Sequence, residues 1–418
     1  MTTHVNYLPD EILLEVLAYI EAWDTREKQA TLARFCAVNR QWYDVAIRPL
    51  YDSPFLTGRA YDLFVRTICP SVLAHIKPTS LSSLIRVLDL SHIIHQGTKS
   101  TTARLLGRTK QGLQVFIAPQ ASFAINCWAS LSKCEKLRVL DLSLVSECIS
   151  FQSLAQTLRR LSALERIYLP RCTSSDEGLG LSINVRWPSK LQHLSLSGSI
   201  YGKFLWDLLR QPDHFPPSLH SLSILHSPGL DHNGIRPLLQ NLETSLTTVE
   251  LRDLPNVKHG RLNSVLEWLP HLTNLTVSLD YIDSRFGHMP PEWTPEMWPA
   301  ARPLQSLTLV TSGQTSIDPS RCFTAVDLYT LIDDRYLGRL RYLNIAQSSE
   351  WENEQEGAEI GALEMLLIDD LDRENWEKRR WHYEGLDIPG GAALNYDDWR
   401  KTPQGRRMGA RMRMLKDR

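Results

Sequence analysis

Histidine and cysteine are the side chains best suited to catalysis or metal binding, and their spacing in this 418-residue chain favours neither. The thirteen histidines are scattered. His226 and His232 are six residues apart in an expected loop, a poor spacing for a shared metal. The seven cysteines include no CxxC pair, so neither a zinc cage nor a disulfide framework is indicated. Phosphate-binding glycine loops, zinc-protease helices and nucleophile elbows are also missing from the sequence. We therefore expect no catalytic residue, no metal and no cofactor.

Charge and hydropathy narrow the classes of partner. The formal net charge of −1 and the pI near 6.9 give no global attraction to nucleic acid or to anionic lipid. No stretch is apolar for long enough to span a bilayer, and Asp10, Glu11 and Glu15 interrupt the only candidate signal segment. We expect no membrane and no nucleic acid as partner, and a cytoplasmic and/or nuclear protein with reduced thiols.

The chain's potential for binding lies in a short phrase that recurs eleven times between Ile85 and Ile368. It reads leucine-like, two variable residues, leucine-like, one variable residue, leucine-like, as in residues 137–142 and 191–196. The copy at Phe116 is degenerate. The second leucine-like positions are Leu88, Phe116, Leu140, Ile167, Leu194, Leu222, Val249, Leu275, Leu307, Leu343 and Leu366.

Each phrase predicts a strand, and the segments between phrases predict helices. Phe151, Leu154 and Leu158 recur at three or four residues, the spacing of one helix face. A strand of this kind cannot bury its apolar face without an identical neighbour beside it. This pattern resembles the leucine-rich-repeat family. The resemblance implies an α/β solenoid over residues 51–370, with parallel strands on the concave side and helices on the convex side.

The resemblance is incomplete at one position of the repeat. The third residue after the last leucine should be Asn or Cys, and only Cys172 obeys, so the turns must be satisfied in another way. Residues 50–56, followed by Tyr61, Phe64 and Ile68 at helical spacing, suggest an additional, atypical first unit.

Variable residues beside the core leucines are the candidate substrate-binding residues. Alternate side chains of a strand point to opposite faces, so these residues would line the concave face. Glu250 and Arg252 are the most distinctive pair, although they could equally neutralise each other, and the whole set could be a plain solvated face. The candidates on strands are Tyr168, His193, Ser195, Ser223, Glu250, Arg252, Tyr342 and Asn344.

An insertion at residues 280–303 adds two further candidates, Trp293 and Trp298. Five prolines accompany them and lower the entropy lost on ordering, while tryptophan is a common anchor at interfaces. Insertions between repeats tend to become loops on one face, often the binding face. The alternative is a loop folded back over the edge of the array.

The N-terminal residues 7–51 predict three short helices. The first carries an apolar stripe after Pro9, which suits a helix start because its missing N–H would be unpaired there. The second is expected to end near Asn39, and Pro49 is expected to stop the third. Three helices in about 45 residues approach the size at which a lone core fails, yet the segment holds more apolar surface than it can enclose.

This segment resembles an F-box. The matching residues are Leu8, Pro9, Ile12, Leu13, Val16, Leu17, Leu32, Cys36, Val38, Trp42, Ala46, Leu50 and Tyr51. The resemblance implies an F-box over residues 1–50 that docks onto a Skp-type adaptor, and through it onto a cullin and a RING subunit. Carried over by position, the adaptor-binding residues are Leu8, Pro9, Ile12, Leu13, Val16 and Trp42. For each of them the alternative is packing within the helical module.

The C-terminal residues 371–418 form a third region. Residues 350–374 hold ten acids against one base, and residues 400–418 hold eight bases against one acid. A basic tail could contact nucleic acid or act as a nuclear signal. Because three tryptophans lie between the two blocks, we expect the region to fold back and cap the last repeat, whose strand edge would otherwise be unpaired.

The sequence thus predicts a non-catalytic substrate-recognition subunit of an SCF-type ubiquitin ligase. In that reading the F-box holds the adaptor and the repeat array holds a protein substrate. The main alternative is a leucine-rich-repeat interaction scaffold with a helical cap and no link to ubiquitination.

Overall fold

The computed structural model describes residues 8–70, 79–93, 97–147, 149–170, 173–174, 186–198, 215–313, 322–349, 351, 357–383 and 395–416. The chain divides into two compact units, which are described one after the other. The first unit is Met1–Gln192 with His214–Pro216, and the second unit is His193–Asp213 with Pro217–Arg418.

The first unit begins with three helices, as expected. They are α1 (Asp10–Glu21), α2 (Thr25–Cys36) and α3 (Arg40–Asp52). Side-chain caps fix two of the starts, because Asp24 accepts from the Arg26 N–H and Asn39 accepts from the Trp42 N–H. The core of this helical module consists of the buried residues Leu17, Ile20, Leu32 and Ala46.

Pro49 does not stop the third helix, contrary to expectation. α3 continues through it to Asp52. Proline removes one helical N–H, but Leu50 packs against the core of the module, and Tyr51 stacks on Phe64 with 6.3 Å between ring centroids. These contacts outweigh one lost hydrogen bond at the end of the helix.

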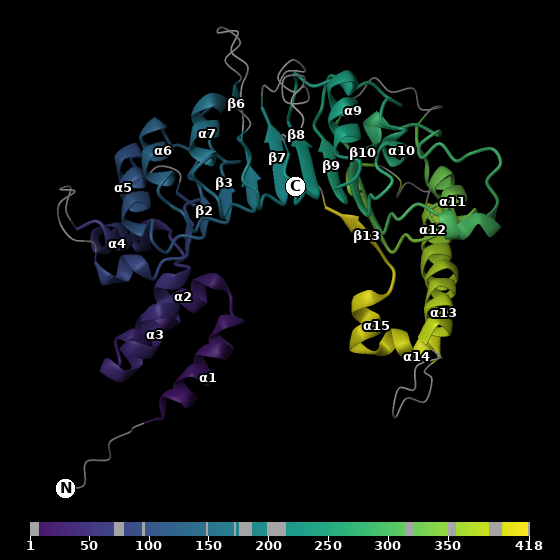
Figure 1. Ribbon diagram of the computed structural model, residues 1–418. Helices are drawn as coiled ribbons and strands as arrows, with labels where there is room; N and C mark the ends of the chain where they lie inside the picture. The colour runs from purple at the N-terminus through teal and green to yellow at the C-terminus, as the bar shows by residue number, and fades with distance from the viewer. Residues whose placement is uncertain are drawn as a thin grey trace. The chain divides into compact units, whose positions relative to one another are not determined.

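The repeat strands of the first unit pair in parallel in the order β1, β2, β3 and β5 (Figure 1). The register aligns the second leucine-like residues of the phrases, so Leu88 pairs with Phe116, Phe116 with Leu140, and Leu140 with Ile167. The degenerate phrase at Phe116 is therefore a true strand. The strands are β1 (Val87–Asp89), β2 (Val115–Ile117), β3 (Val139–Asp141) and β5 (Arg166–Tyr168), and a separate parallel pair is β4 (Ile149–Ser150) with β6 (Thr173–Ser174).

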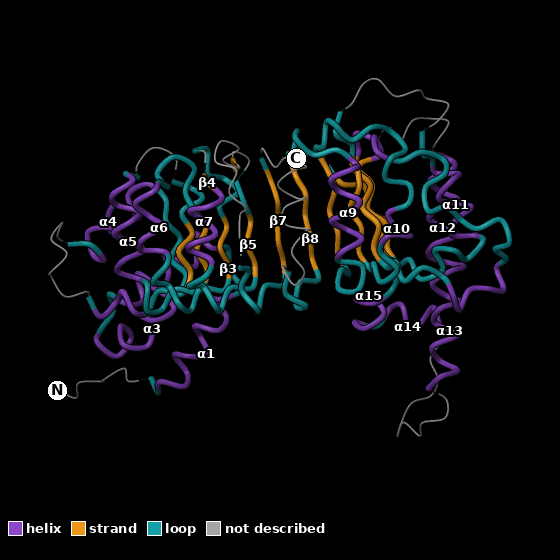
Figure 2. The backbone as a smooth tube through the Cα atoms, turned by 45° about the horizontal axis from the view of Figure 1, so that its top comes forward, coloured by secondary structure: helices purple, strands orange, loops and turns teal. Residues whose placement is uncertain are grey.

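Helices form a second layer beside these strands. Figure 2 shows α5, α6 and α7 side by side along one side of the strands. The helices are α4 (Gly58–Ile68), the 3₁₀ turn η1 (Ser80–Ser83), α5 (Lys99–Thr109), α6 (Ile125–Leu131) and α7 (Phe151–Leu158). The expected helical segment after residue 60 is α4, which buries Tyr61, Phe64 and Ile68.

The expected atypical first unit contains no strand. Leu50 and Tyr51 belong to α3, yet the carbonyl of Asp52 accepts a hydrogen bond from the Arg86 N–H at 3.0 Å. The same contact recurs one repeat later, where the Arg86 carbonyl accepts from the Gln114 N–H. The series of backbone hydrogen bonds that connects successive repeats therefore begins at the last residue of α3.

The described part of the second unit holds seven parallel strands in the order β7, β8, β9, β10, β11, β12 and β13. The second leucine-like residues are again in register, from Leu194 and Leu222 to Leu307 and Leu343. The strands are β7 (His193–Ser197), β8 (Ser221–Leu225), β9 (Thr248–Arg252), β10 (Asn274–Ser278), β11 (Ser306–Val310), β12 (Tyr342–Ala346) and β13 (Arg411–Leu415).

Helices and 3₁₀ turns connect these strands. Among the described residues the α-helices are α9 (His232–Asn241), α10 (Val265–Trp268), α11 (Ala325–Asp333), α12 (Gly357–Met365), α13 (Asp372–Tyr383), α14 (Tyr396–Lys401) and α15 (Pro403–Met408). The 3₁₀ turns are η3 (Leu279–Tyr281), η4 (Pro295–Ala300) and η6 (Gln347–Ser349), and η7 (Leu366–Leu371) is a π-helix. The predicted α/β architecture, with N-terminal helices followed by parallel strands and helices, is confirmed.

The strand predicted at the eleventh phrase, around Leu366, was wrong. This segment is helical from α12 through η7, and Leu363, Leu367 and Leu371 are buried. Leucines at positions 363, 366 and 367 share one helix face, so the spacing of the phrase also fits a helix here. The strand beside β12 comes instead from residues 411–415, where Met412 pairs with Leu343.

Turns without the asparagine ladder are satisfied by other side chains. After β9, the buried hydroxyl of Tyr281 accepts from the Leu254 N–H at 2.6 Å and donates to the Ser312 hydroxyl at 3.0 Å. The Ser312 N–H in turn donates to Asp280 at 2.6 Å. In the first unit, Asp141 accepts from the Ser143 N–H. Tyrosine, serine and aspartate thus replace the missing asparagines.

Candidate protein-binding surfaces

Helix α1 presents an apolar stripe to solvent. We name it the α1 stripe: Leu8, Ile12, Val16, Tyr19 and Trp23, spaced by four, four, three and four residues. Ile12, Val16 and Tyr19 lie on one face of α1, and the same spacing continues to Leu8 before the helix and Trp23 after it. Tyr19 is 71% exposed, and the other four range from 39% to 50%.

The neighbouring face of α1 is buried and holds the module together. Leu13, Leu17 and Ile20 are 0%, 5% and 3% exposed. A buried leucine-sized side chain contributes about 1.5–3 kcal/mol, so these residues fix α1 on α2 and α3. Leu13 was expected to contact the adaptor from an exposed position. It has no exposed surface and packs within the helical module instead.

The start of α3 lies beside the start of α1. Gln41 donates from its side-chain amide to the Leu8 carbonyl and to the Asp10 carboxylate, both at 2.7 Å. Trp42 is half-buried, and its ring lies 4.2 Å from that of Phe35. Trp42 therefore shares its surface between the module's interior and the solvent.

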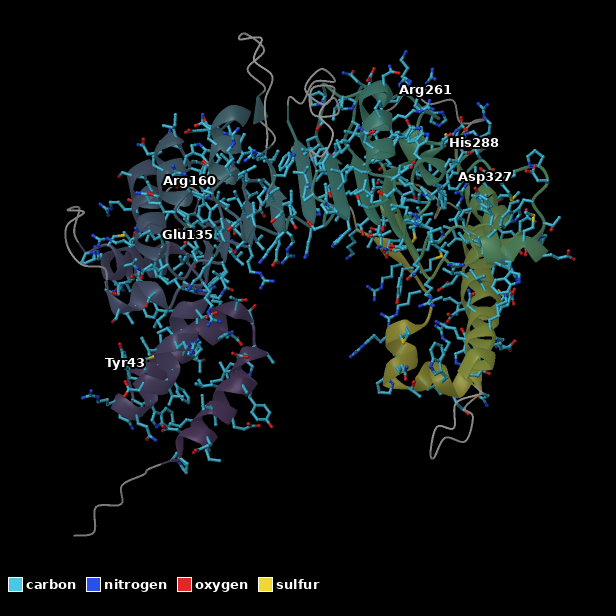
Figure 3. The ribbon with its side chains drawn as sticks, in the orientation of Figure 1. Tyr43, Glu135, Arg160, Arg261, His288 and Asp327 are labelled. Atoms are coloured by element: carbon cyan, nitrogen blue, oxygen red, sulfur yellow. The ribbon has the colours of Figure 1, made fainter. Side chains whose placement is uncertain are left out.

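Exposed apolar side chains are concentrated in this module. Sixteen large apolar side chains are exposed in the described part of the chain, and eight of them lie between residues 8 and 43. Besides the α1 stripe they are Leu14, Val38 and Tyr43. Figure 3 shows Tyr43 on the helical module. Pro9 is also exposed. The excess of apolar surface expected from the sequence is present, and six of these eight side chains lie on α1 or next to its ends.

Sequence reasoning missed two members of the α1 stripe, Tyr19 and Trp23. Both continue the spacing that starts at Leu8, Ile12 and Val16, so the periodicity alone could have found them. They were missed because the stripe was read through Leu13 and Leu17, which belong to the buried face.

The second unit has an open face on which four of the candidate substrate-binding residues form a row with three further residues. Strand register aligns them across the sheet, one from each strand. We name this set the open-face row: Ser195, Ser223, Glu250, Thr276, Thr308, Asn344 and Arg413. Arg413 was not among the candidates, because the C-terminal region was expected to cap the last repeat and no strand was predicted within it.

Two of the seven residues in the open-face row carry little exposed surface. Ser195 is 3% exposed and Ser223 is 5% exposed, so these two candidates present almost nothing to a partner and were poor choices. The Ser223 hydroxyl donates to Glu250 at 3.0 Å, and Glu250 also pairs with Arg252 at 3.0 Å. The alternative that Glu250 and Arg252 neutralise each other is therefore realised.

The other candidates on strands are half-buried and hydrogen-bonded. His193 lies 2.7 Å from the Ser221 hydroxyl through Nδ1, and Asn344 donates to Thr308 at 3.1 Å. The Tyr342 hydroxyl donates to the Arg407 carbonyl at 3.3 Å. Tyr168 is half-buried on β5 of the first unit, whereas all the other candidates lie in the second unit.

The insertion at residues 280–303 folds back onto the repeats. Trp293 donates from its indole nitrogen to the Asp334 carbonyl at 2.8 Å, and its ring meets Tyr336 edge-on at 5.0 Å. Trp298 remains 42% exposed, with the Lys378 ammonium 3.7 Å from its ring centroid. Trp293 is thus a packing residue, and Trp298 keeps a free face.

Nucleophiles and metal ligands are not assembled into a site within the described ranges. No group of three or more His, Cys, Asp or Glu residues there could hold a metal ion. Burial raises the pKa of the Cys134 thiol to about 12, which disfavours its nucleophilic thiolate. No described helix is long and apolar enough to cross a membrane.

Comparison with protein families identifies the helical module. Residues 5–57 match the F-box-like family model. They are an F-box-like domain. The α1 stripe, Pro9 and Trp42 all lie within it, as does the whole of α1, α2 and α3.

Two yeast proteins are similar to this chain. Protein pof5 of Schizosaccharomyces pombe is 29% identical over 376 residues, which cover 88% of this chain and 97% of that protein. F-box protein YDR306C of Saccharomyces cerevisiae is 28% identical over 286 residues, which cover 66% of this chain and 57% of that protein. The chain thus aligns with little more than half of the second relative.

Solved structures resemble the chain only partially. A yeast Rad7–Elc1 complex matches with a TM-score of 0.40 and 14% identity, over 81% of this chain and 80% of that one. A complex of TLR13 with ssRNA13 matches with a TM-score of 0.34 and 13% identity, over 63% of this chain and 40% of that one. At these TM-scores the likenesses say nothing about what this chain binds.

Proposed function

We propose that this protein is a non-catalytic substrate receptor of an SCF-type ubiquitin ligase. The F-box-like domain would bind a Skp-type adaptor, and through it a cullin and a RING subunit. The repeats would bind a protein client in the cytoplasm or nucleus. Ubiquitin transfer would then be favoured by proximity, because a held client presents its lysines at a raised effective concentration.

The observation that carries the proposal is the α1 stripe. Five exposed apolar side chains, including a tyrosine and a tryptophan, follow one face of α1 and its flanking residues, and the adjacent face of α1 is buried. Amphipathic helices of this kind bind partners by laying their apolar face into a groove. Trp and Tyr at the centre of such an interface commonly dominate the binding free energy.

Adaptor binding is tested on the full-length chain co-expressed with a Skp-type adaptor. We expect wild type to co-purify with the adaptor and Ile12→Asp with Tyr19→Asp to lose it. The double substitution puts two charges into an apolar interface, and a loss of more than about tenfold in affinity is expected. Binding is measured by calorimetry on the purified chains.

The matched control is Leu14→Asp. Leu14 is 56% exposed on the same helix but lies outside the α1 stripe, so this variant should retain the adaptor. Circular dichroism checks that all three proteins are folded. Equal adaptor affinity in the stripe and control variants contradicts the proposal. So does a wild type that is a monodisperse monomer with no adaptor affinity, the behaviour of a leucine-rich-repeat scaffold unconnected to ubiquitination.

A further inference from the structure

Strand β13 is the last strand of the second unit's sheet. It pairs with β12 along its whole length, from Tyr342 with Arg411 to Ala346 with Leu415. On its other side no strand pairs with it among the described residues. All five of its residues are half-buried or exposed, unlike the central strands. β13 therefore has an accessible edge.

The backbone of β13 offers hydrogen-bonding groups at this edge. The Arg411 N–H donates to the Arg341 carbonyl on the β12 side at 2.8 Å. The backbone groups of successive residues in a parallel strand point alternately to its two neighbours. The N–H and C=O of Arg413 therefore also point toward β12, and those of Met412 and Met414 point toward the free edge. An unpaired edge of this kind is a template for an added strand.

Charge determines which strand fits. Arg411 and Arg413 lie on the open face, in register with Tyr342 and Asn344, and neither β12 partner carries a charge. Arg413 and Lys416 are exposed, and no ion pair joins Arg411, Arg413 or Lys416 to a carboxylate in the described part of the chain. A second copy of the chain would set arginine against arginine across the edge, which disfavours self-association.

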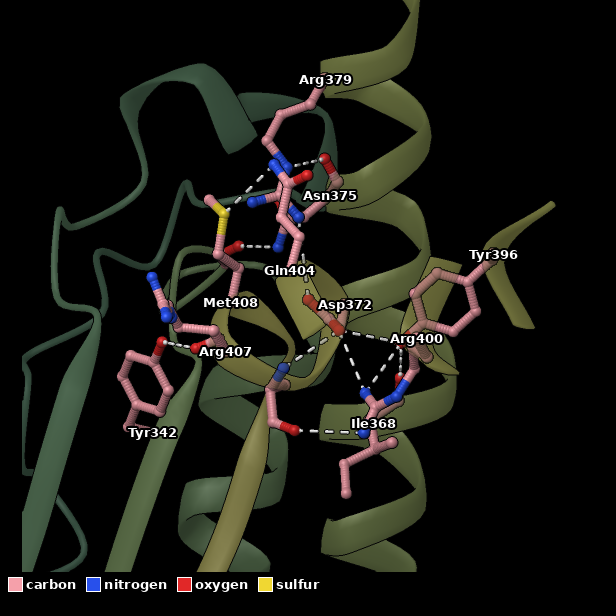
Figure 4. A network of polar contacts seen from close by, with 12 residues as sticks. Tyr342, Ile368, Asp372, Asn375, Arg379, Tyr396, Arg400, Gln404, Arg407 and Met408 are labelled. Atoms are coloured by element: carbon pink, nitrogen blue, oxygen red, sulfur yellow. Dashed lines mark hydrogen bonds and ion pairs between the residues drawn. The ribbon is translucent and has the colours of Figure 1, made fainter. Parts of the chain in front are cut away.

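A buried carboxylate holds β13 in place (Figure 4). Asp372 Oδ2 accepts from the Ala410 N–H at 3.0 Å, the Arg400 guanidinium at 3.1 Å and the Tyr396 hydroxyl at 2.9 Å. Its side chain is 0% exposed. Ala410 is the residue before β13, so the chain is anchored directly before the strand, and the strand is preorganised for a partner.

From these observations we propose that β13 is a docking strand for an extended acidic segment of a client protein. The segment adds to the β13 edge and carries acidic residues at alternate positions, beside Arg411 and Arg413. The intervening apolar residues lie beside Met412 and Met414. This inference rests on the proposed function in one respect, that the occupant is a client of the receptor.

The test uses the full-length chain with its adaptor and a fluorescent peptide that alternates glutamate and valine. We expect the peptide to bind, and a peptide with lysine in place of glutamate not to bind. Arg411→Glu with Arg413→Glu should weaken binding at least tenfold. Met412→Pro should do the same, because it removes an N–H that faces the free edge and spares the pairing with β12. Fluorescence anisotropy measures each affinity.

The control variant is Lys133→Glu with Lys136→Glu, which makes the same charge change on exposed residues of the first unit. It should bind the acidic peptide like wild type, and all variants should retain the adaptor. Equal affinity for the lysine peptide overturns the proposal. Unchanged binding by Met412→Pro overturns it too, since attraction to the arginines alone would then suffice. If wild type does not bind the adaptor, the proposed function is contradicted instead. The peptide affinities can still be interpreted in that case.

Discussion

Single residues decide which surfaces of this protein are available. Leu13 and Ile12 are adjacent in sequence, yet one is fully buried and the other is 50% exposed. The helical period could predict that α1 has a buried face and an apolar exposed face. It could not assign each residue to one of them, because both faces are apolar and only the packing against α2 and α3 distinguishes them.

The stability of the C-terminal region should depend on pH through Glu374. Burial raises its pKa, but a hydrogen bond from Lys378 and the charge of Arg335, 2.7 Å away, outweigh this and lower it. A carboxylate with a lowered folded-state pKa stabilises the fold above its unfolded pKa of about 4.3, and that stability is lost as pH falls through the folded value.

We therefore expect Glu374→Gln to destabilise the protein at pH 7 and to match wild type progressively more closely toward about pH 3. Urea denaturation at several pH values measures the difference. Glu377→Gln is the matched control, because Glu377 is exposed on the same helix and has no ion pair among the described residues. A difference that stays constant with pH, or that appears equally in the control, contradicts the prediction.

At the scale of the element, the sequence predicted strands better than turns. Ten of the eleven phrases are strands, because parallel strands stacked on identical neighbours need the same three apolar positions in each. Leu366 failed because its spacing fits a helix equally well. β13 was missed although Arg411 to Met414 alternate polar and apolar residues, the period of a strand. Its high positive charge made the segment resemble a tail.

The turn after β9 depends on the hydroxyl of Tyr281. We expect Tyr281→Phe to destabilise the protein by about 1–3 kcal/mol, because it leaves the buried Leu254 N–H without its partner. Thermal and chemical denaturation measure the loss. Tyr329→Phe is the control, since no hydrogen bond of the Tyr329 hydroxyl is found in the described residues. Equal stability of the two variants would show that the turn does not need the hydroxyl.

At the scale of the whole molecule, the architecture was predictable because it repeats. Each strand contacts its sequence neighbours, so a local phrase is enough to predict a long sheet. The exposure of the residues in the open-face row was not predictable in the same way. Ser195 and Ser223 occupy the same strand position as Asn344 and Arg413, and their burial depends on neighbouring side chains rather than on their own position in the phrase.

Removing residues 371–418 should lower both stability and solubility. The truncation takes away β13 and the Asp372 network and leaves the edge of β12 without its partner strand. We expect a lower midpoint of thermal unfolding and more aggregation on size-exclusion chromatography. A truncated chain that is as stable and soluble as wild type would mean that the C-terminal region does not act as a cap.

The hydrogen bond from Arg86 to Asp52 has a mechanical consequence within the first unit. The last residue of α3 is bonded directly to the first repeat, and the side chains of Asp52 and Arg86 also pair at 3.4 Å. Because both a backbone hydrogen bond and an ion pair connect α3 to the first repeat, rotation between them is restricted. The orientation of the first repeats relative to the F-box-like domain is therefore restrained by these contacts. An insertion of a single residue after α3 would break this contact and change the orientation of the first repeats relative to the F-box-like domain, even if both parts still folded.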